Sequence, residues 1–272
     1  MRPIGIFDSG VGGLSVLRSL RQVLPAEPLL YLADQAHVPY GPRPLEQVRY
    51  FSEQITRYLL GEGAKLIVVA CNAASAAALQ HLRQVFPEIP FVGMEPAVKP
   101  AAEQTRSGVV GVLATPATFQ GALYASVVER FANGVNLLQS TCPGLVQQIE
   151  AGDLDGPVTH GILEGALRPM LAQGIDTVVL GCTHYPFVIP LIEQIVGPGV
   201  RVIDPAPAVA RQVARLLDER GLRQPEKNES SEIRLITTGD VPAMAARVRG
   251  MIGEGADVEG AVWLNGEINQ PG

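Results

Sequence analysis

The sequence contains few cysteines, few lysines and no long hydrophobic run. No apolar stretch approaches the roughly 18 residues that a membrane-spanning helix needs, and Asp8 interrupts the N-terminal segment before a signal-peptide core could form. We therefore expect a cytoplasmic protein without a membrane partner. The three cysteines, Cys71, Cys142 and Cys182, lack the spacing of a disulfide scaffold or a zinc knuckle, so any function they have would lie in their reactivity.

Basic residues are also scarce. The chain has 21 Lys and Arg against 27 Asp and Glu, and no basic stripe that could neutralise a nucleic-acid backbone, so nucleic acid is not an expected partner. Only three of these basic residues are lysines, namely Lys65, Lys99 and Lys227. They lie before a predicted strand, next to a proline and in a polar connector, and none is an obvious Schiff-base site. This disfavours pyridoxal phosphate as a cofactor.

What the sequence does contain is the alternation of an α/β protein. Its 272 residues are 47% apolar and 18% charged, which is typical of a compact folded chain of one large domain or two ordinary ones. Short apolar runs, expected as parallel strands, alternate with segments of helical periodicity. The predicted strands are Ile4–Phe7, Leu29–Ala33, Leu66–Ala70, Phe91–Gly93, Val109–Leu113, Thr177–Gly181, Val200–Ile203 and Ile233–Thr237. The predicted helices are one from near Leu14, then Pro44–Leu60, Ala74–Val85, Thr118–Phe131, Val158–Leu171, Phe187–Val196, Ala206–Leu217 and Val241–Ile252.

Three short patterns recur in the same order, each about 110 residues later. The strand beginning at Ile4 resembles the one at Val110, the segment before Cys71 resembles the one before Cys182, and Met94-Glu95-Pro96 resembles Ile203-Asp204-Pro205. The repetition predicts two pseudo-symmetric α/β domains with mainly parallel sheets. We expect residues 1–96 with 207–272 to form the first domain and 97–206 the second, the tail returning to complete the first.

Two cysteines follow equivalent predicted strands. Ligands in such sheets bind at the carboxyl ends of the strands, where Cys71 precedes Asn72 and Cys182 precedes Thr183 and His184. A single cytoplasmic cysteine is usually a small buried hydrophobe, but matched positions and polar neighbours favour two reactive thiols. Two facing thiols can invert a carbon centre, because one removes a proton and the other returns one from the opposite side. This is racemase or epimerase chemistry.

Other chemistries of cysteine fit less well. A redox disulfide usually forms within Cys-x-x-Cys, whereas these cysteines lie in separate predicted domains. A phosphatase-type loop would need Arg six residues after the cysteine, where this chain has Ala77 and Val188. Zinc binding by Cys182 and His184 lacks a third ligand at a standard spacing, so no metal is expected. Cys142 has no counterpart in the other half, and we interpret it as structural.

The first predicted strand ends in a glycine-rich loop, Asp8-Ser9-Gly10-Val11-Gly12-Gly13. Its N–H groups and the following helix N-terminus favour an anion, and because neither the dinucleotide nor the Walker pattern is complete, we expect a carboxylate. Asp8 is either a turn residue or a group that polarises the first thiol or binds an ammonium group. Thr115 and Thr118 occupy the equivalent place in the second half, where their hydroxyls could reach a ligand.

These residues carry a family resemblance. The chain resembles the glutamate racemases, cofactor-independent bacterial enzymes that supply D-glutamate for peptidoglycan, over residues 4–205. The motifs that carry the resemblance are Phe7-Asp8-Ser9-Gly10-Val11-Gly12-Gly13-Leu14, Pro39-Tyr40-Gly41, Ala70-Cys71-Asn72 and Leu180-Gly181-Cys182-Thr183-His184-Tyr185-Pro186. It implies a two-domain α/β fold with the active site in the cleft between the domains. It also implies that Cys71 and Cys182 are the acid/base thiols, assisted by Asp8 and His184. The residues that it implies for substrate binding are Asp8, Ser9, Tyr40, Gly41, Asn72, Ala73, Thr118, Thr183 and His184.

Several positions qualify the resemblance. Glu150 matches an acid often placed near the second thiol, although taken alone it would be assigned to the solvated surface. Position 73 is Ala where the family commonly has Thr, so the site loses a hydroxyl but keeps a backbone N–H. Position 37 is His where relatives frequently have Arg. We expect glutamate as substrate, while an aspartate or other acidic amino-acid racemase and a non-catalytic binding or inhibitor protein stay open, as does the oligomeric state, a homodimer included.

Overall fold

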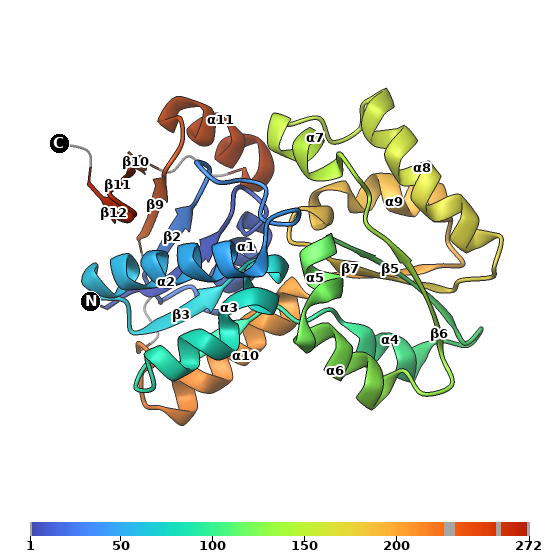
Figure 1. The fold of residues 1–272 in the computed structure, drawn as a ribbon, viewed down its shortest axis with the longest axis horizontal. Helices are drawn as coiled ribbons and strands as arrows, with labels where there is room; N and C mark the ends of the chain where they lie inside the picture. The colour runs from blue at the N-terminus through green and yellow to red at the C-terminus, as the bar shows by residue number, and fades with distance from the viewer. Residues whose placement is uncertain (1, 226–231, 254–256, 271–272) are drawn as a thin grey trace.

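The computed structural model describes residues 2–225, 232–253 and 257–270, so Lys227 lies outside the described residues. Two separate parallel sheets organise the chain, and Figure 1 shows them side by side. We call the part built on the six-stranded sheet the first lobe and the part built on the four-stranded sheet the second lobe. The predicted α/β class with parallel sheets is therefore confirmed.

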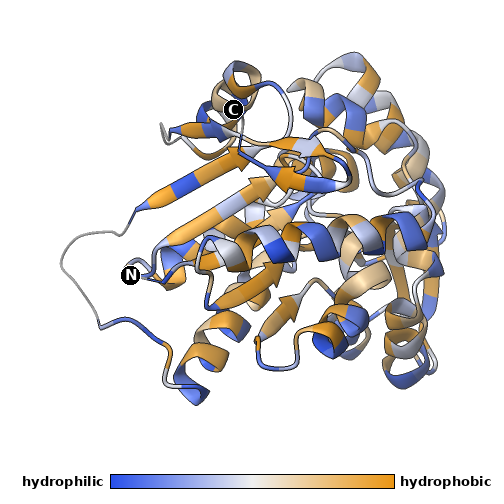
Figure 2. Ribbon diagram, turned by 60° about the vertical axis from the view of Figure 1, so that its left-hand side comes forward, coloured by the Kyte–Doolittle hydropathy of each residue, from blue (hydrophilic) through white to orange (hydrophobic). Residues whose placement is uncertain are grey.

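The first sheet has the strand order β10-β9-β2-β1-β3-β4, and every neighbouring pair is parallel. Its strands are β1 (Ile4–Asp8), β2 (Leu29–Ala33), β3 (Leu66–Val69), β4 (Phe91–Gly93), β9 (Ile233–Thr237) and β10 (Val258–Gly260). The four residues of β3 and the five of β1 and β2 are all buried, which explains why these strands are apolar throughout (Figure 2).

Helices cover both faces of this sheet. They are α1 (Leu14–Val23), α2 (Leu45–Gly61), α3 (Asn72–Val85), α10 (Ala206–Glu219) and α11 (Val241–Ile252). A short antiparallel hairpin, β11 (Val262–Leu264) and β12 (Glu267–Asn269), follows β10 and lies against α2. Both β9 and the hairpin bring the C-terminal part of the chain back to the first lobe.

The second sheet has the order β6-β5-β7-β8 and is also fully parallel. This order repeats the β2-β1-β3-β4 core of the first sheet, so the pseudo-symmetry expected from the sequence is confirmed. The strands are β5 (Val109–Ala114), β6 (Asn136–Ser140), β7 (Thr177–Gly181) and β8 (Arg201–Ile203). The surrounding helices are α4 (Val98–Gln104), α5 (Pro116–Gln120), α6 (Ala122–Phe131), α7 (Leu145–Ala151), α8 (Pro157–Leu171), the 3-10 turn η1 (Tyr185–Val188) and α9 (Ile189–Val196).

Two local predictions about the second lobe are wrong. The helix predicted over Thr118–Phe131 is broken at Gly121, whose backbone is extended and where a Cβ would lie 2.5 Å from the Cβ of Ala76 in α3. The strand β6 was not predicted, because Asn136–Ser140 is an edge strand with polar ends rather than an apolar run. Both features depend on neighbouring elements that the local pattern does not report.

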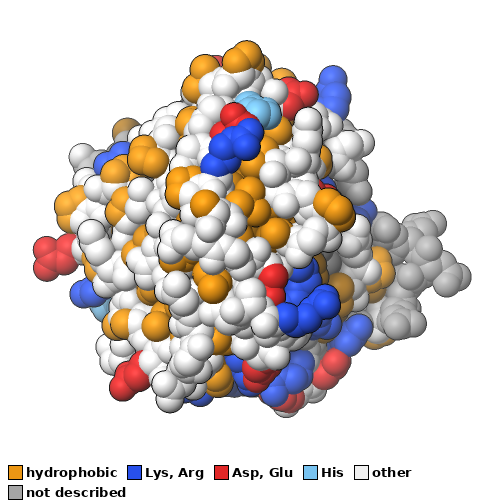
Figure 3. All heavy atoms as spheres, turned by 90° about the vertical axis from the view of Figure 1, so that its right-hand side faces the viewer, with side chains coloured by type: hydrophobic (Ala, Val, Ile, Leu, Met, Phe, Trp, Pro, Cys, Tyr) orange, Lys and Arg blue, Asp and Glu red, His pale blue; other side chains and the backbone are white. Residues whose placement is uncertain are grey.

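Buried apolar residues join the two lobes. One continuous cluster contains Ile4 and Ile6 of β1 as well as Leu180 at the end of β7. On the outer face of the second lobe, acidic and basic side chains are intermixed, and they surround an area without charged side chains (Figure 3). No helix within the described ranges is both long and apolar enough to cross a membrane. The domain boundaries at residues 96/97 and 206/207 stay a prediction.

Candidate active site

The carboxyl ends of β1, β3, β5 and β7 meet between the lobes around a small cavity. Its volume is about 20 Å³, which is room for about one water molecule. The residues that line it are Ser9, Pro39, Tyr40, Gly41, Cys71, Asn72, Ala73, Thr115, Val146, Cys182, Thr183 and His184. A larger cavity of about 780 Å³ lies between β4, β8 and α10, but neither Cys71 nor Cys182 lines it. The chemistry therefore belongs to the small cavity.

Cys71 precedes α3, where an extended backbone turns into the helix. Its side chain lies at the positive end of the helix dipole, and the backbone N–H of Ala74 in the first turn lowers the pKa of the thiol. Burial raises the pKa of the Cys71 thiol well above its usual value of 9.0, and the negative charge of Asp8 raises the pKa further. Cys71 is therefore protonated at neutral pH in this conformation.

Asp8 ends β1 and is fully buried. Its Oδ2 accepts hydrogen bonds from the N–H groups of Gly10 (3.2 Å) and Gly13 (3.0 Å), and its Oδ1 accepts one from the hydroxyl of Thr183 (3.4 Å). The glycine loop thus holds a carboxylate, as its sequence predicts, but the carboxylate is a side chain of the protein. The Asp8 carboxylate is also close enough to Cys71 to raise the pKa of its thiol.

Cys182 follows β7 and has a different partner. Its Sγ lies 3.7 Å from Nδ1 of His184, and Nε2 of His184 lies 2.7 Å from a carboxylate oxygen of Glu150. Burial lowers the pKa of His184, but the hydrogen bonds to Cys182 and Glu150 raise it more, so that it lies well above 6.5. Burial raises the pKa of Glu150, yet the hydrogen bond and charge of His184 leave it below 4.5. A positively charged imidazole therefore lies beside the sulfur of Cys182.

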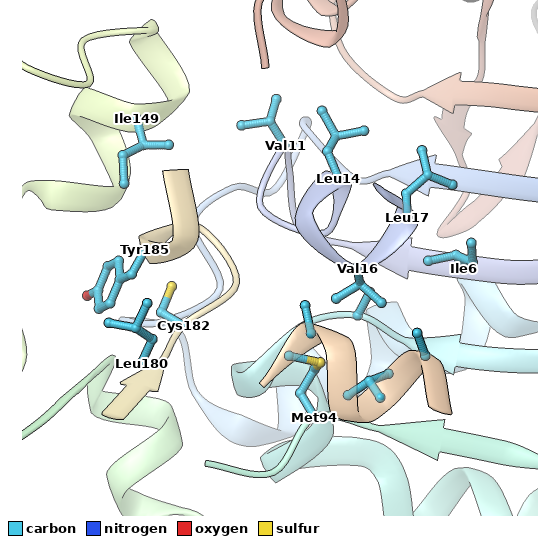
Figure 4. Packing of buried hydrophobic residues seen from close by; sticks show 14 of the residues in the cluster. Ile6, Val11, Leu14, Val16, Leu17, Met94, Ile149, Leu180, Cys182 and Tyr185 are labelled. Atoms are coloured by element: carbon cyan, nitrogen blue, oxygen red, sulfur yellow. The ribbon is translucent and has the colours of Figure 1, made fainter. Parts of the chain in front are cut away.

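Glu150 also joins the second lobe to the first. The N–H of Val11 donates to its Oε1 (2.8 Å), and the side-chain amide of Gln35 donates to its Oε2 (3.3 Å). The lobes approach so closely here that a Cβ at Gly12 would lie 2.5 Å from Nδ1 of His184. In Figure 4, Cys182 and Ile149 lie on the second lobe, with Val11 on the facing loop of the first. Gly12 is thus needed for the close contact between the lobes.

The side chain of Asn72 has unused hydrogen-bonding capacity. It lines the cavity and is 2% exposed, yet neither Nδ2 nor Oδ1 has a hydrogen-bond partner among the described residues. A buried polar group without a partner costs about 1–3 kcal/mol. A polar ligand in the cavity would satisfy this amide, so Asn72 is a strong candidate for ligand binding.

The structure brings together most of the residues selected from the sequence. Three of the selected residues do not line the cavity themselves. They are Asp8, which accepts a hydrogen bond from Thr183, Thr118, whose hydroxyl lies 3.1 Å from that of Thr115, and Glu150, which lies behind His184. Pro39 and Val146 line the cavity without having been selected, since a single proline or apolar residue carries no local sign of a site. The third cysteine, Cys142, is buried outside the cavity lining.

The described part of the chain contains no cluster of three or more His, Cys, Asp and Glu that could hold a metal ion. The groups that converge on the cavity are instead two thiols, a carboxylate, an imidazole and an unpaired amide. This set can exchange protons with a small polar ligand from two sides.

Comparisons with known proteins point in the same direction. The sequence profile of the Asp/Glu/Hydantoin racemase family matches residues 4–213. A glutamate racemase from Roseiflexus sp. is 55% identical over 239 residues, which cover 88% of each chain. The crystal structure of glutamate racemase isoform RacE1 from Bacillus anthracis superposes with a TM-score of 0.86 at 32% identity, covering 95% of this chain and 96% of that one. The Escherichia coli glutamate racemase in complex with L-glutamate and the activator UDP-MurNAc-ala gives a TM-score of 0.82 at 32% identity, covering 97% of this chain and 100% of that one.

Proposed function

The chain belongs to the Asp/Glu/hydantoin racemase family, and we propose that it interconverts L- and D-glutamate by proton transfer at Cα, without pyridoxal phosphate or a metal ion. The observation that carries this proposal is that Cys71 and Cys182, from equivalent strand ends of opposite lobes, line one cavity. Membership of a racemase family supports the reaction class, and the glutamate racemases among its relatives support the substrate.

In the proposed mechanism, one sulfur acts as a thiolate and the other as a thiol. The thiolate takes the Cα proton, and the electron pair of the broken C–H bond passes into the adjoining carboxylate. The thiol then gives its proton to the opposite face of Cα, which forms the new C–H bond and leaves the enantiomer. After this turnover the two cysteines have exchanged protonation states, so the enzyme is ready to catalyse the reverse reaction.

The neighbouring groups have separate proposed roles. We assign Asp8 to Cys71 and His184 to Cys182 as the groups that assist proton transfer, with Glu150 holding His184 charged. Ser9, Tyr40, Gly41, Asn72 and Thr183 would bind the substrate. The backbone N–H groups in the first turn of α3 would stabilise the developing negative charge, because a helix N-terminus favours an anion. Thr118 would act through Thr115 rather than directly.

Lobe movement is a necessary part of this proposal. A cavity with room for about one water molecule cannot admit glutamate, so the lobes must separate to bind the substrate and close again around it. Closure excludes water, which would otherwise compete with the thiols as a proton donor. We propose that the enzyme acts in the cytoplasm and that its product, D-glutamate, is used for peptidoglycan. The resemblance to the bacterial racemases supports this proposal.

The direct test uses purified protein freed of pyridoxal phosphate and metal ions. Incubation with L-glutamate in D₂O is expected to give D-glutamate that carries deuterium at Cα, measured by chiral chromatography and mass spectrometry. Parallel assays with L-aspartate test the substrate, and the Cys142→Ser variant is the matched control because it removes a thiol outside the cavity. Absence of both racemisation and exchange would refute the proposed function, and faster turnover of aspartate would refute the substrate.

A further inference from the structure

A second buried carboxylate, outside the cavity lining, accepts hydrogen bonds from several segments. Asp34 follows β2 and is fully buried. It accepts hydrogen bonds from the hydroxyl of Tyr40 (2.6 Å), Nδ1 of His37 (2.9 Å), the hydroxyl of Thr238 (2.8 Å) and Nε1 of Trp263 (2.7 Å). The carboxylate thus ties together the loop after β2, the end of β9 and the C-terminal hairpin.

Aromatic rings pack against the residues that bind Asp34. The ring of His37 stacks on Phe51 of α2 with centroids 3.9 Å apart, and Trp263 packs edge-on against both His37 (4.9 Å) and Phe51 (5.5 Å). Trp263 is therefore held in place by its ring as well as by its N–H. Removing only the N–H donor would leave these ring contacts available.

The loop that Asp34 holds is also a wall of the cavity. Pro39, Tyr40 and Gly41 line it, and Tyr40 is 1% exposed with its hydroxyl on Asp34. The loop reaches the other lobe as well, because the carbonyl oxygen of Gly41 accepts a hydrogen bond from the N–H of Ala117 (3.0 Å). A Cβ at Gly41 would lie 2.7 Å from Thr115, so the loop must keep its position closely when the lobes close.

We propose that Asp34 is a positioning residue for the substrate-binding wall formed by residues 39–41, and that Trp263 of the C-terminal hairpin anchors Asp34. The inference rests on the proposed function, since it gives a distant hairpin a role in binding the glutamate enantiomers. Asp34 acts by holding the Tyr40 hydroxyl, and Trp263 acts by supplying a donor to the carboxylate. Neither residue lines the cavity.

The kinetic test compares two variants of the same region. Trp263→Phe keeps an aromatic ring but removes the donor to Asp34, whereas Tyr50→Phe removes the hydrogen bond from α2 to the carbonyl of Gly266 in the hairpin and leaves Asp34 untouched. We expect Trp263→Phe to raise KM for both enantiomers about three- to ten-fold with kcat within about two-fold, and Tyr50→Phe to leave both constants unchanged. An unchanged KM in Trp263→Phe, or an equal rise in both variants, would overturn the proposal.

Two more variants separate positioning from general loss of stability. Thr238→Val removes another donor to Asp34, and Asp34→Asn combined with Trp263→Phe forms a double-mutant cycle. If Trp263 acts through Asp34, the double variant should be no worse in KM than Asp34→Asn alone. Additive effects on KM would mean that Trp263 works by another route. If Asp34→Asn does not fold, Thr238→Val and Trp263→Phe still decide, because both must raise KM.

An assay without turnover keeps this inference distinct from the proposed function. Alkylation by iodoacetamide, followed by peptide mass spectrometry, reports how well residues 39–41 cover Cys71 and Cys182. We expect Trp263→Phe to speed alkylation of these two thiols about three-fold or more over wild type, with Tyr50→Phe at the wild-type rate. Cys142 is the internal control, because it is buried outside the cavity lining and residues 39–41 do not cover it. Unchanged alkylation in Trp263→Phe overturns the inference, even if wild type proves to have no racemase activity.

Discussion

The two cysteine sites occupy equivalent places in the two lobes but differ in their electrostatics. Cys71 lies beside the carboxylate of Asp8, and both burial and that charge raise its pKa. Cys182 lies beside His184, whose pKa is raised through hydrogen bonds to Cys182 and Glu150. A repeated fold has therefore placed the same reactive atom twice and given it partners of opposite charge.

This difference concerns which sulfur holds the proton in the resting enzyme. The negative partner keeps Cys71 as a thiol, whereas the sulfur of Cys182 lies beside a positively charged imidazole. In the proposed mechanism each turnover uses one thiol and one thiolate, and after it the two sulfurs have exchanged roles. The two enantiomers have equal free energies, so the overall reaction favours neither direction. The asymmetry between the two cysteine sites instead determines how the activation barrier is divided between the two proton transfers.

The largest expected effect comes from removing either sulfur. Cys71→Ser and Cys182→Ser should each lower racemisation by about 10²- to 10⁴-fold or more, since one proton transfer loses its acid/base group. The remaining thiol can still remove and return a proton on one face. Each variant should therefore exchange the Cα proton of one enantiomer with D₂O, and the two variants should act on opposite enantiomers. Exchange of the same enantiomer by both would break the comparison between the lobes.

Replacing the partners of the two thiols should lower the rate less, and it should change the isotope effect differently in the two directions. Asp8→Asn and His184→Gln are each expected to lower kcat/KM about 10²-fold, and equally in both directions because the equilibrium lies midway between the enantiomers. The difference should appear with Cα-deuterated substrate. His184→Gln should raise the isotope effect for the enantiomer that Cys182 deprotonates, and Asp8→Asn for the other. Equal isotope effects in both directions would show that the partners are not specific to one thiol.

A third effect concerns stability. The lowered pKa of Glu150 contributes stability above its unfolded value of 4.5, and this is lost as the pH falls through the folded value. The raised pKa of His184 contributes below 6.5 and is lost as the pH rises through the folded value. Glu150→Gln should therefore lower the free energy of unfolding by about 3 kcal/mol, mostly between the folded-state pKa of Glu150 and that of His184. Urea unfolding across the pH range measures this, and a pH-independent difference would contradict the charged pair.

The smallest effect concerns the residue pairs after the two cysteines. The second lobe provides the hydroxyl of Thr183, whereas the first lobe has Ala73 at the end of Cys71-Asn72-Ala73. Ala73→Thr should lower KM about three- to ten-fold by adding a hydrogen-bonding hydroxyl to the cavity wall. Ala73→Val is the matched control, because it adds similar bulk without the hydroxyl. An equal change in KM for both variants would mean that volume, and not hydrogen bonding, matters at this position.

Much of this arrangement could be predicted from local sequence. The predicted strands and the repeat at about 110 residues correspond to real elements, because buried parallel strands are apolar throughout and their carboxyl ends are marked by polar residues. The helix α2 was also visible, because Leu45, Val48, Phe51, Ile55 and Leu59 recur at helical spacing. Edge strand β6 and the break at Gly121 were not, because the first has polar ends and the second depends on contact with Ala76.

The candidate site could be predicted from the sequence to a similar extent as the fold. Cys71 and Cys182 stood out by their positions, but Glu150 taken alone looked solvated, and nothing near it in sequence indicated contacts with Val11 and Gln35. His37, which stands where relatives frequently have Arg, had no assignable role until the structure placed it on Asp34. These residues act through partners that lie far away along the chain.

The sequence by itself determined the alternating α/β elements, the two matched cysteines and the family, because periodicity and strand-end motifs are local properties. Only the tertiary structure decided which charge each thiol meets and which distant segments hold the walls of the cavity. The contact between Asp34 and Trp263 spans 229 residues, and that between Val11 and Glu150 spans 139. Such contacts arise when separate elements pack together, and a hydrogen bond formed in this way leaves no pattern in the neighbouring sequence.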